Sequence, residues 1–408
     1  MHGRLDARDL AHDADPRLHA YAELHLALGT AARDLLEVPA VAELLERSGI
    51  EGEQGRLGLL AAMVDAKKDE RLGRLLMALE ERAGVSREWT EGLAGAAASQ
   101  RVAALVPSLV SRLVLRDTRE TVRGALVTFG RPALDELWGT LLDPLRERRL
   151  RVHLPNSIAR FGSKTAAELL LACIETETDG LVRYKAIRGL GRIAAARQVT
   201  VNRPRVERLA YANLVEHFRL LGLRAPFATP GPVGDPEQST TRVLLVGLLD
   251  DKLRQSVERT FRLLKIAHPR DDIRRLMIAS QSSDTRARAN AAELLDALLR
   301  RGDQRALREL ILIEADDLPI GERAARGSAL LHTTPPATTE EAVAQMTADR
   351  DAALAALASL HAATLAGKPA RVAFGGLGER PSVELTTAGR PAMASDPAAQ
   401  EQEQPPRD

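Results

Sequence analysis

The chain has 408 residues, of which 45% are hydrophobic and 28% are charged, and its formal net charge is +1. This composition is that of a globular protein and excludes a collagen-like or fully disordered chain. Aromatic residues make up only 3%, which disfavours an all-β fold, and the single cysteine excludes an intramolecular disulfide and a cysteine-based zinc site. Because Ala, Leu, Arg and Glu favour helices, we expect a nearly all-helical protein.

The sequence shows no pattern of a targeting signal. Its longest apolar runs fall far short of the ~18 residues that a membrane span requires. The N-terminal residues alternate in charge and lack the apolar segment of a secretory signal. We therefore expect a cytoplasmic protein without a transmembrane segment, and a peripheral position at the inner membrane stays open.

Charge is distributed unevenly along the chain. Residues 101–313 contain 37 Lys and Arg against 24 Asp and Glu, a net charge of +13, and the rest of the chain has a net charge of −12. A basic middle segment indicates either a surface for an acidic partner or Arg-rich helix faces that are merely solvated. The sequence alone favours the second, simpler interpretation.

In chain order, the first predicted elements are amphipathic helical segments at residues 17–47 and 56–83, where Leu and Ala recur at three- and four-residue spacing. We expect them to form less regular helical hairpins in an N-terminal domain of residues 1–97. His19 and Glu23 would share one helix face as metal ligands, but no third ligand has motif spacing, so no metal site is predicted.

A repeat of about thirty residues follows, within a predicted core of residues 98–316. Three segments with apolar residues at helical spacing close with a glycine, at Gly130, Gly162 and Gly191. Glycine is the expected helix stop, because it adopts the left-handed conformation without Cβ strain. The spacing predicts units of two helices and a tight turn, which must stack to bury their apolar faces.

The second helix of these units opens with a recurring pattern. Asp117-Thr-Arg begins one such helix, and related sequences begin at Glu177 and Asp284. We expect the Asp or Thr of each pattern to cap the helix by accepting from its free backbone amides. Arg123 and Arg183 each follow a Val that faces the core, so we predict that both are structural residues.

At these residues the chain resembles HEAT repeats, whose second helix opens with Asp, then Val-Arg, then small residues, and ends near Gly. The resemblance implies an all-α fold of stacked antiparallel helix hairpins, an α-solenoid of the HEAT or armadillo type. It also implies that Arg123 and Arg183 pair with an acidic residue of a neighbouring repeat. For Arg183, Asp179 and Glu177 are local candidates. The middle unit departs from the pattern, since Pro155 stands where the Arg is expected.

Residues 100–302 as a whole, with the runs HLPNSIARFG and DGLVRYKAIRGLGRI, resemble a more specific group. They are similar to the soluble HEAT domain that is appended to certain bacterial nucleotide-translocase-like transporters of the major-facilitator type. The chain has no transporter segment, so the resemblance implies neither transport nor catalytic residues. It implies a protein partner, with a membrane transporter or another membrane protein among the candidates.

The remaining elements are less regular. Residues 225–238 contain four prolines and predict a loop, followed by a helix at about 240–267. Residues 317–408 are predicted to contain a linker, one Ala-rich helix at about 340–366 and a disordered tail.

Residues 183–208 give the strongest surface signal, because they contain eight Lys and Arg against Glu207 alone. On a helix, Lys185, Arg188 and Arg192 fall within about 60° of one another and opposite the apolar face. The candidate binding surface comprises Lys185, Arg188, Arg192, Arg203 and Arg205.

No catalytic constellation emerges from the sequence. The run Phe161-Gly-Ser-Lys-Thr has the wrong order for a phosphate-binding loop, and Cys173 lies in an apolar run typical of a buried thiol. We therefore predict a non-enzymatic scaffold or protein-interaction module without a cofactor. The alternative is a nucleic-acid-binding protein resembling HEAT-like DNA glycosylases, which would need an aromatic-lined pocket and a carboxylate beside the basic strip. The scarcity of aromatic residues argues against base stacking.

Overall fold

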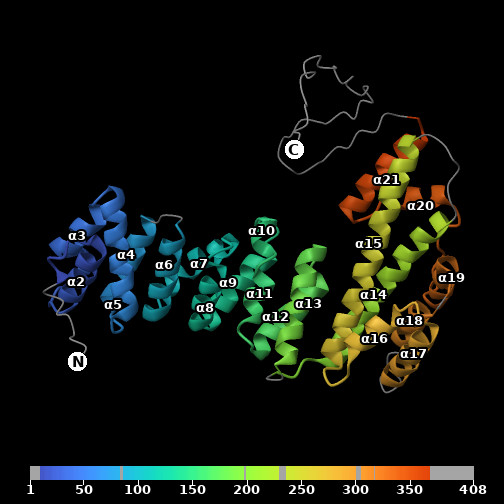
Figure 1. The fold of residues 1–408 in the computed structure, drawn as a ribbon, viewed down its shortest axis with the longest axis horizontal. Helices are drawn as coiled ribbons and strands as arrows, with labels where there is room; N and C mark the ends of the chain where they lie inside the picture. Colours follow the sequence, from blue (N-terminus) through green and yellow to red (C-terminus); the bar gives the residue numbers. More distant parts are fainter. Residues whose placement is uncertain are drawn as a thin grey trace, which may run out of the picture. The chain divides into compact units, whose positions relative to one another are not determined.

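The computed structural model describes residues 10–82, 86–196, 199–228, 236–299, 305–316 and 318–367. All regular secondary structure in these ranges is helical, which confirms the all-α class (Figure 1). None of the helices described is both long and apolar enough to cross a membrane. The chain divides into two compact units, Met1–His217 with Gln255–Asp317, and Phe218–Arg254 with Leu318–Asp408.

The first unit begins with a group of short helices. They are α2 (Pro16–Leu28), η1 (Leu35–Glu37), α3 (Pro39–Glu46), α4 (Gly49–Asp65), α5 (Glu70–Glu81) and α6 (Arg87–Gln100). Helix α4 packs against both α2 and α6, and its Leu59 and Leu60 are fully buried. The stretch 17–47 is not one continuous helix, because Asp34 caps η1 and Pro39 starts α3 as a first-turn proline.

The repeat region of this unit follows. Its helices are η2 (Ala103–Leu105), α7 (Val106–Ser111), η3 (Arg112–Val114), α8 (Arg119–Phe129), α9 (Arg131–Leu142), α10 (Arg148–Arg151), α11 (Leu154–Ala159), α12 (Lys164–Thr176) and α13 (Gly180–Ala195). Helix α8 packs against α6 and α9, and α13 packs against α11 and α12. Each helix therefore buries its apolar side against a neighbour close in sequence.

The three repeat glycines do not play the same role. Gly130 ends α8 with a φ of 66°, and Gly162 has a φ of 59° in the turn between α11 and α12. The prediction that Gly191 stops a helix is wrong, because α13 continues to Ala195 and buries Ile193 and Ala194 beyond it. An added Cβ at Gly191 would lie 3.7 Å from Cγ1 of Ile266, an ordinary contact distance, so neither the backbone nor the packing requires glycine there.

Of the predicted helix caps, one is confirmed and one is wrong. Asp179 caps α13, since its side chain accepts from the amides of Leu181 and Val182. The expected cap at the pattern that begins with Asp117 is wrong. Helix α8 begins after Thr118, which has helical dihedrals and makes no side-chain capping bond. A capping side chain needs an extended backbone to reach the free amides, and Thr118 does not provide one.

The helices of the rest of the chain are divided between the two units. Its helices are α14 (Arg203–Arg224), η4 (Ala225–Ala228), α15 (Pro236–Ala267), α16 (Ile273–Ser280), α17 (Thr285–Leu299), α18 (Arg305–Ala315), α19 (Ile320–Leu330), α20 (Thr339–Thr347) and α21 (Ala352–Leu365). The predicted core 98–316 is therefore not one unit, because Phe218–Arg254 belongs to the second. The predicted loop 225–238 contains η4 and the start of α15, and its middle lies outside the described residues.

Two further corrections concern the second unit. The predicted linker after residue 317 contains α19, and the predicted single helix at 340–366 is two helices, α20 and α21. Asp351 causes this break, since its side chain caps α21 by accepting from the amide of Leu354. The predicted disordered tail, from residue 368 onward, lies outside the described residues.

A cationic groove between α13 and α15

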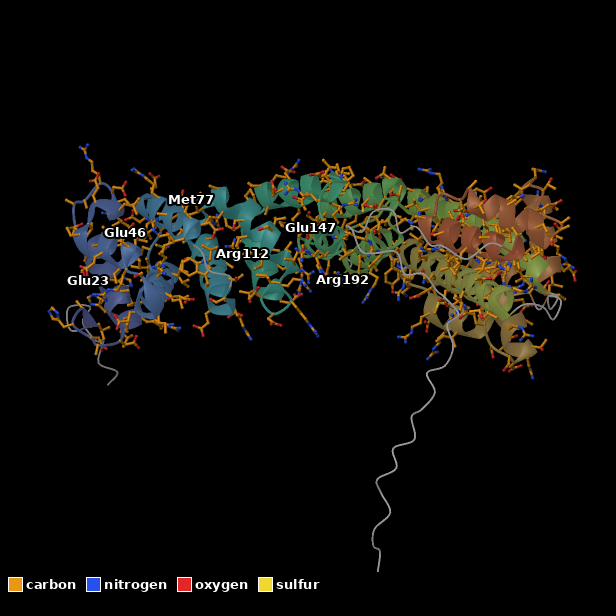
Figure 2. All side chains as sticks on the ribbon, turned by 90° about the horizontal axis from the view of Figure 1, so that it is seen from above. Glu23, Glu46, Met77, Arg112, Glu147 and Arg192 are labelled. Atoms are coloured by element: carbon orange, nitrogen blue, oxygen red, sulfur yellow. The ribbon has the colours of Figure 1, made fainter. Side chains whose placement is uncertain are left out.

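Helix α13 presents two distinct faces. Val182, Ile187 and Leu190 are buried in the core of the first unit, while Arg188 and Arg192 are exposed. Figure 2 labels Arg192 among the side chains on the green part of the ribbon, which holds α11 to α13. The cap at Asp179 fixes where α13 begins, and so it fixes which residues of α13 face outward.

The exposed face of α13 borders a groove of about 490 Å³ that the C-terminal half of α15 completes. Four of its lining side chains are cationic, Arg188 and Arg192 from α13 and Arg262 and Lys265 from α15. The remaining lining residues are Ile187, Gly191, Ala194, Ala195, Ile266 and Pro269. Among the described residues that line this cationic groove there is no carboxylate and no aromatic ring, so it combines an apolar floor with a positive rim.

Tyr184 connects the two helices at the edge of the cationic groove. The guanidinium carbons of Arg188 and Arg262 lie 5.9 Å and 5.4 Å from the centre of its ring. The Tyr184 hydroxyl donates to Oε1 of Glu258 at 3.4 Å, and Arg262 donates to the same oxygen at 2.6 Å. These contacts hold both guanidinium groups beside the ring, where the electron-rich π face favours a cation.

Lys265 has a different anchor. Its Nζ donates to the backbone carbonyls of Pro269 and Asp271, at 3.3 Å and 2.7 Å. The loop after α15 is thereby fixed, because carbonyl groups beyond a helix end need donors. The ammonium charge has no carboxylate partner among the described residues, so it contributes to the positive rim.

Arg192 lies among other arginines. Its guanidinium donates to Oδ1 of Asn156 on α11. Burial lowers the pKa of Arg192, and the nearby guanidinium groups of Arg160, Arg188 and Arg123 lower it further. Such mutual repulsion means that positive charge is concentrated beyond what the neighbouring carboxylates balance.

His153 lies near cations of both α8 and α13. Burial lowers the pKa of this imidazole from 6.5 to about 4, and the cations Arg119, Arg123 and Lys185 add to the shift. The imidazole is therefore neutral at neutral pH.

The five residues of the predicted binding surface do not form one site. Arg205 is bound by two carboxylates of α12, Glu168 and Glu175, each at 2.6 Å. Arg203 pairs with Glu207 at 2.8 Å and lines a separate pocket beside His268. The predicted surface therefore reduces to its α13 members.

The sequence analysis missed the residues that complete the cationic groove. Arg262 and Lys265 come from α15, and Tyr184 comes from α13 itself. The only sequence signal is that Arg262 and Lys265 are three residues apart, which places them on one helix face. Nothing in the sequence pairs that face with α13, because the two helices are about seventy residues apart.

Of the two arginines of the repeat pattern, Arg123 departs from the expected pairing with an acid of a neighbouring repeat. Arg123 is buried, with 5% of its surface exposed, and it pairs with Glu120 of its own helix. It also donates to Oγ of Ser157 at 3.1 Å, so its contact with the neighbouring helix is polar rather than acidic. Arg183 is half-buried.

The two carboxylates expected to be local candidates for Arg183 both bond to α10. Arg148 donates to Asp179, and Arg151 donates to Glu177 at 2.7 Å. These bonds tie the start of α13 to α10, so the carboxylates hold the repeat together.

The other candidate chemistry of the sequence proves structural. Ser163 caps α12 by accepting from the amide of Ala166, so the run around it is a helix start. Cys173 is buried, and burial raises the pKa of its thiol to about 12. In the described ranges no group of three or more His, Cys, Asp or Glu side chains is arranged to hold a metal ion.

Comparisons with protein-family models, with curated proteins and with solved structures find no match to this chain. A fold class hosts many functions, so the all-helical fold assigns none by itself. The cationic groove is the feature from which a function follows.

Proposed function

We propose that this protein is a non-enzymatic interaction module whose cationic groove binds an acidic segment of a partner protein. The observation that carries the proposal is that Arg188, Arg192, Arg262 and Lys265 rim an apolar floor, and that among the described residues only Arg262 has a carboxylate partner, Glu258. Cations that are held close together without carboxylate partners repel one another, and an anionic partner relieves this repulsion when it binds.

We further propose that helices α7 to α13 are HEAT-like repeats stacked into an α-solenoid. Support comes from the packing of α8 on α9 and of α13 on α11 and α12, and from the positive φ of Gly130 and Gly162. The resemblance to transporter-appended HEAT domains favours a partner at a membrane face, such as the acidic cytoplasmic segment of a transporter.

An acidic protein segment fits the cationic groove better than nucleic acid does. The floor formed by Ile187, Ala194 and Ile266 offers burial to aliphatic side chains, which a sugar-phosphate backbone does not have. The nearest aromatic ring, Tyr184, is already engaged by two guanidinium groups and by Glu258, so it is not free to stack on a base.

Fluorescence anisotropy with a labelled peptide of alternating Glu and Leu tests the proposal. We expect binding that weakens as NaCl is raised, and a loss of about tenfold or more in the variant Arg188→Glu/Arg192→Glu. The matched control is Arg131→Glu/Arg275→Glu, which reverses the same number of charges at positions 70% and 88% exposed. Tighter binding of duplex DNA than of the peptide, lost in the α13 variant, would overturn the proposal in favour of nucleic acid.

A further inference from the structure

The cations of α13 continue beyond the cationic groove, on the side that faces α11. Arg160 of α11 is 53% exposed and pairs with Glu120, which Arg123 also engages. Arg192 reaches the same side through its bond to Asn156. We call Arg160, Lys185, Arg188 and Arg192 the arginine cluster.

The arginine cluster is short of negative charge. Glu120 is shared by two guanidinium groups, and in the described part of the chain Lys185, Arg188 and Arg192 form no ion pair with any carboxylate. Arg192 is close enough to Arg160 and Arg188 for their charges to act on it, and Lys185 lies on the same helix face, one turn before Arg188. A single carboxylate carries one charge and would leave most of this excess unbalanced.

We propose that the arginine cluster recognises a phosphate monoester on the bound segment, a phosphoserine or phosphothreonine side chain. This inference rests on the proposed function, because it specifies the partner of the same surface. A phosphate monoester carries about −1.5 to −2 charges at pH 7 and three acceptor oxygens. Guanidinium groups match that geometry with paired donors, and several of them share one dianion.

The position of the cluster also defines what lies beside the phosphate. Arg188 and Arg192 belong both to the arginine cluster and to the rim of the cationic groove. The phosphorylated residue and the residue on the groove floor are therefore close neighbours in the ligand. Ile187, Ile266 and Pro269 form that floor, so an aliphatic side chain is expected next to the phosphorylated one.

Three labelled peptides that differ at one position test this inference. Each places Leu beside the variable residue, which is phosphothreonine, threonine or glutamate. We expect the phosphothreonine peptide to bind about tenfold tighter than the glutamate peptide. Its affinity should fall between pH 7 and pH 5.5, because the second phosphate pKa is about 6, while the affinity of the glutamate peptide should not.

Two single variants locate the effect. Arg160→Ala should remove most of the preference for phosphothreonine over glutamate, since Arg160 lies outside the groove lining and contributes only to the cluster. The control Arg131→Ala, 70% exposed on α9, should leave the preference unchanged. Far-UV circular dichroism and urea unfolding establish that both variants fold as the unaltered protein does.

The outcomes separate the two proposals. Equal affinity of the three peptides, with the Glu–Leu peptide still bound, overturns phosphate recognition and leaves the proposed function standing. Failure of all four peptides to bind overturns both. Displacement of the phosphothreonine peptide by phosphatidylserine vesicles or duplex DNA, at lower concentration than by the unlabelled peptide, would assign the arginine cluster to lipid or nucleic acid and overturn the inference.

Discussion

The outer face of α13 and the start of α14 are equally basic in sequence but differ in structure. On α13, Lys185, Arg188 and Arg192 have no carboxylate partner among the described residues, whereas on α14 Arg205 is bonded to Glu168 and Glu175 of α12. The carboxylates that neutralise Arg205 lie some thirty residues away in sequence. A run of basic residues is therefore a binding surface only where the tertiary structure brings no acid to it.

The largest effect on stability should come from replacing a buried cation, and not from replacing a cation on either of these two faces. Arg123→Ala removes a buried guanidinium, leaves the hydroxyl oxygen of Ser157 without its donor, and takes one of several donors from the carbonyl of His153. We expect a loss of about 2–4 kcal/mol in the free energy of unfolding, measured by urea titration. A change below about 0.5 kcal/mol would mean that buried and exposed cations in this repeat do not differ in their contribution to the free energy of unfolding.

A second test asks whether burial and the neighbouring cations of α8 and α13 keep His153 neutral in the folded state. The folded pKa of His153 is about 4, below its ordinary value of 6.5. The group therefore stabilises the fold above pH 6.5, and this contribution is lost as the pH falls from 6.5 towards 4. Thermal melts at pH 7 and pH 5 should show a smaller acid-induced drop for His153→Gln than for the unaltered protein. An equal drop in both proteins would contradict the lowered pKa of His153.

A third and smaller effect concerns the paired face. Arg205→Ala leaves Glu168 and Glu175 close together without their shared cation, and both are partly exposed. We expect a loss of about 1 kcal/mol in unfolding free energy, reduced in high salt. Because Arg205 is already neutralised, the affinity for the Glu–Leu peptide should stay within about twofold of the unaltered protein. A loss of binding as large as that of the α13 variant would remove the distinction between the faces.

The smallest effects on stability should come from the cations on the outer face of α13, Lys185 and Arg188. Arg188→Ala and Lys185→Ala remove side chains without ion partners, so each should change the unfolding free energy by no more than about 0.5 kcal/mol. Arg183→Ala is the sensitive comparison, because its half-buried stem covers apolar surface at the edge of the core. We expect a loss of about 1–3 kcal/mol there. If Arg183→Ala unfolds like Lys185→Ala, the predicted register of this repeat is wrong.

Local sequence patterns were reliable where the structure they specify is itself local. Helix class follows from composition, and the cap at Asp179 and the positive φ of Gly130 depend on a few adjacent residues. Gly191 fits the same pattern yet lies inside a helix, because α13 continues past it and buries Ile193 and Ala194. The Ala-rich stretch 340–366 permits a helix throughout, and one capping side chain divides it.

Only part of the candidate site could be predicted from the sequence. The α13 cations follow from helical periodicity, but Arg262 and Lys265 enter only when α15 packs beside α13. The loss of Arg205 from the site is of the same kind, since its acidic partners belong to another helix. Which charges remain unpaired is a property of the assembled fold and not of a sequence window.

The ring of Tyr184 can serve as a spectroscopic probe of ligand binding at this surface. The chain has only three tyrosines, and this one has two guanidinium groups against its ring. An anion that draws Arg188 and Arg262 away would alter the electronic environment of that ring alone. Isotope labelling of tyrosine would then yield a spectrum of three resonances in which a single peak moves as the ligand arrives, without a dye or an added tag.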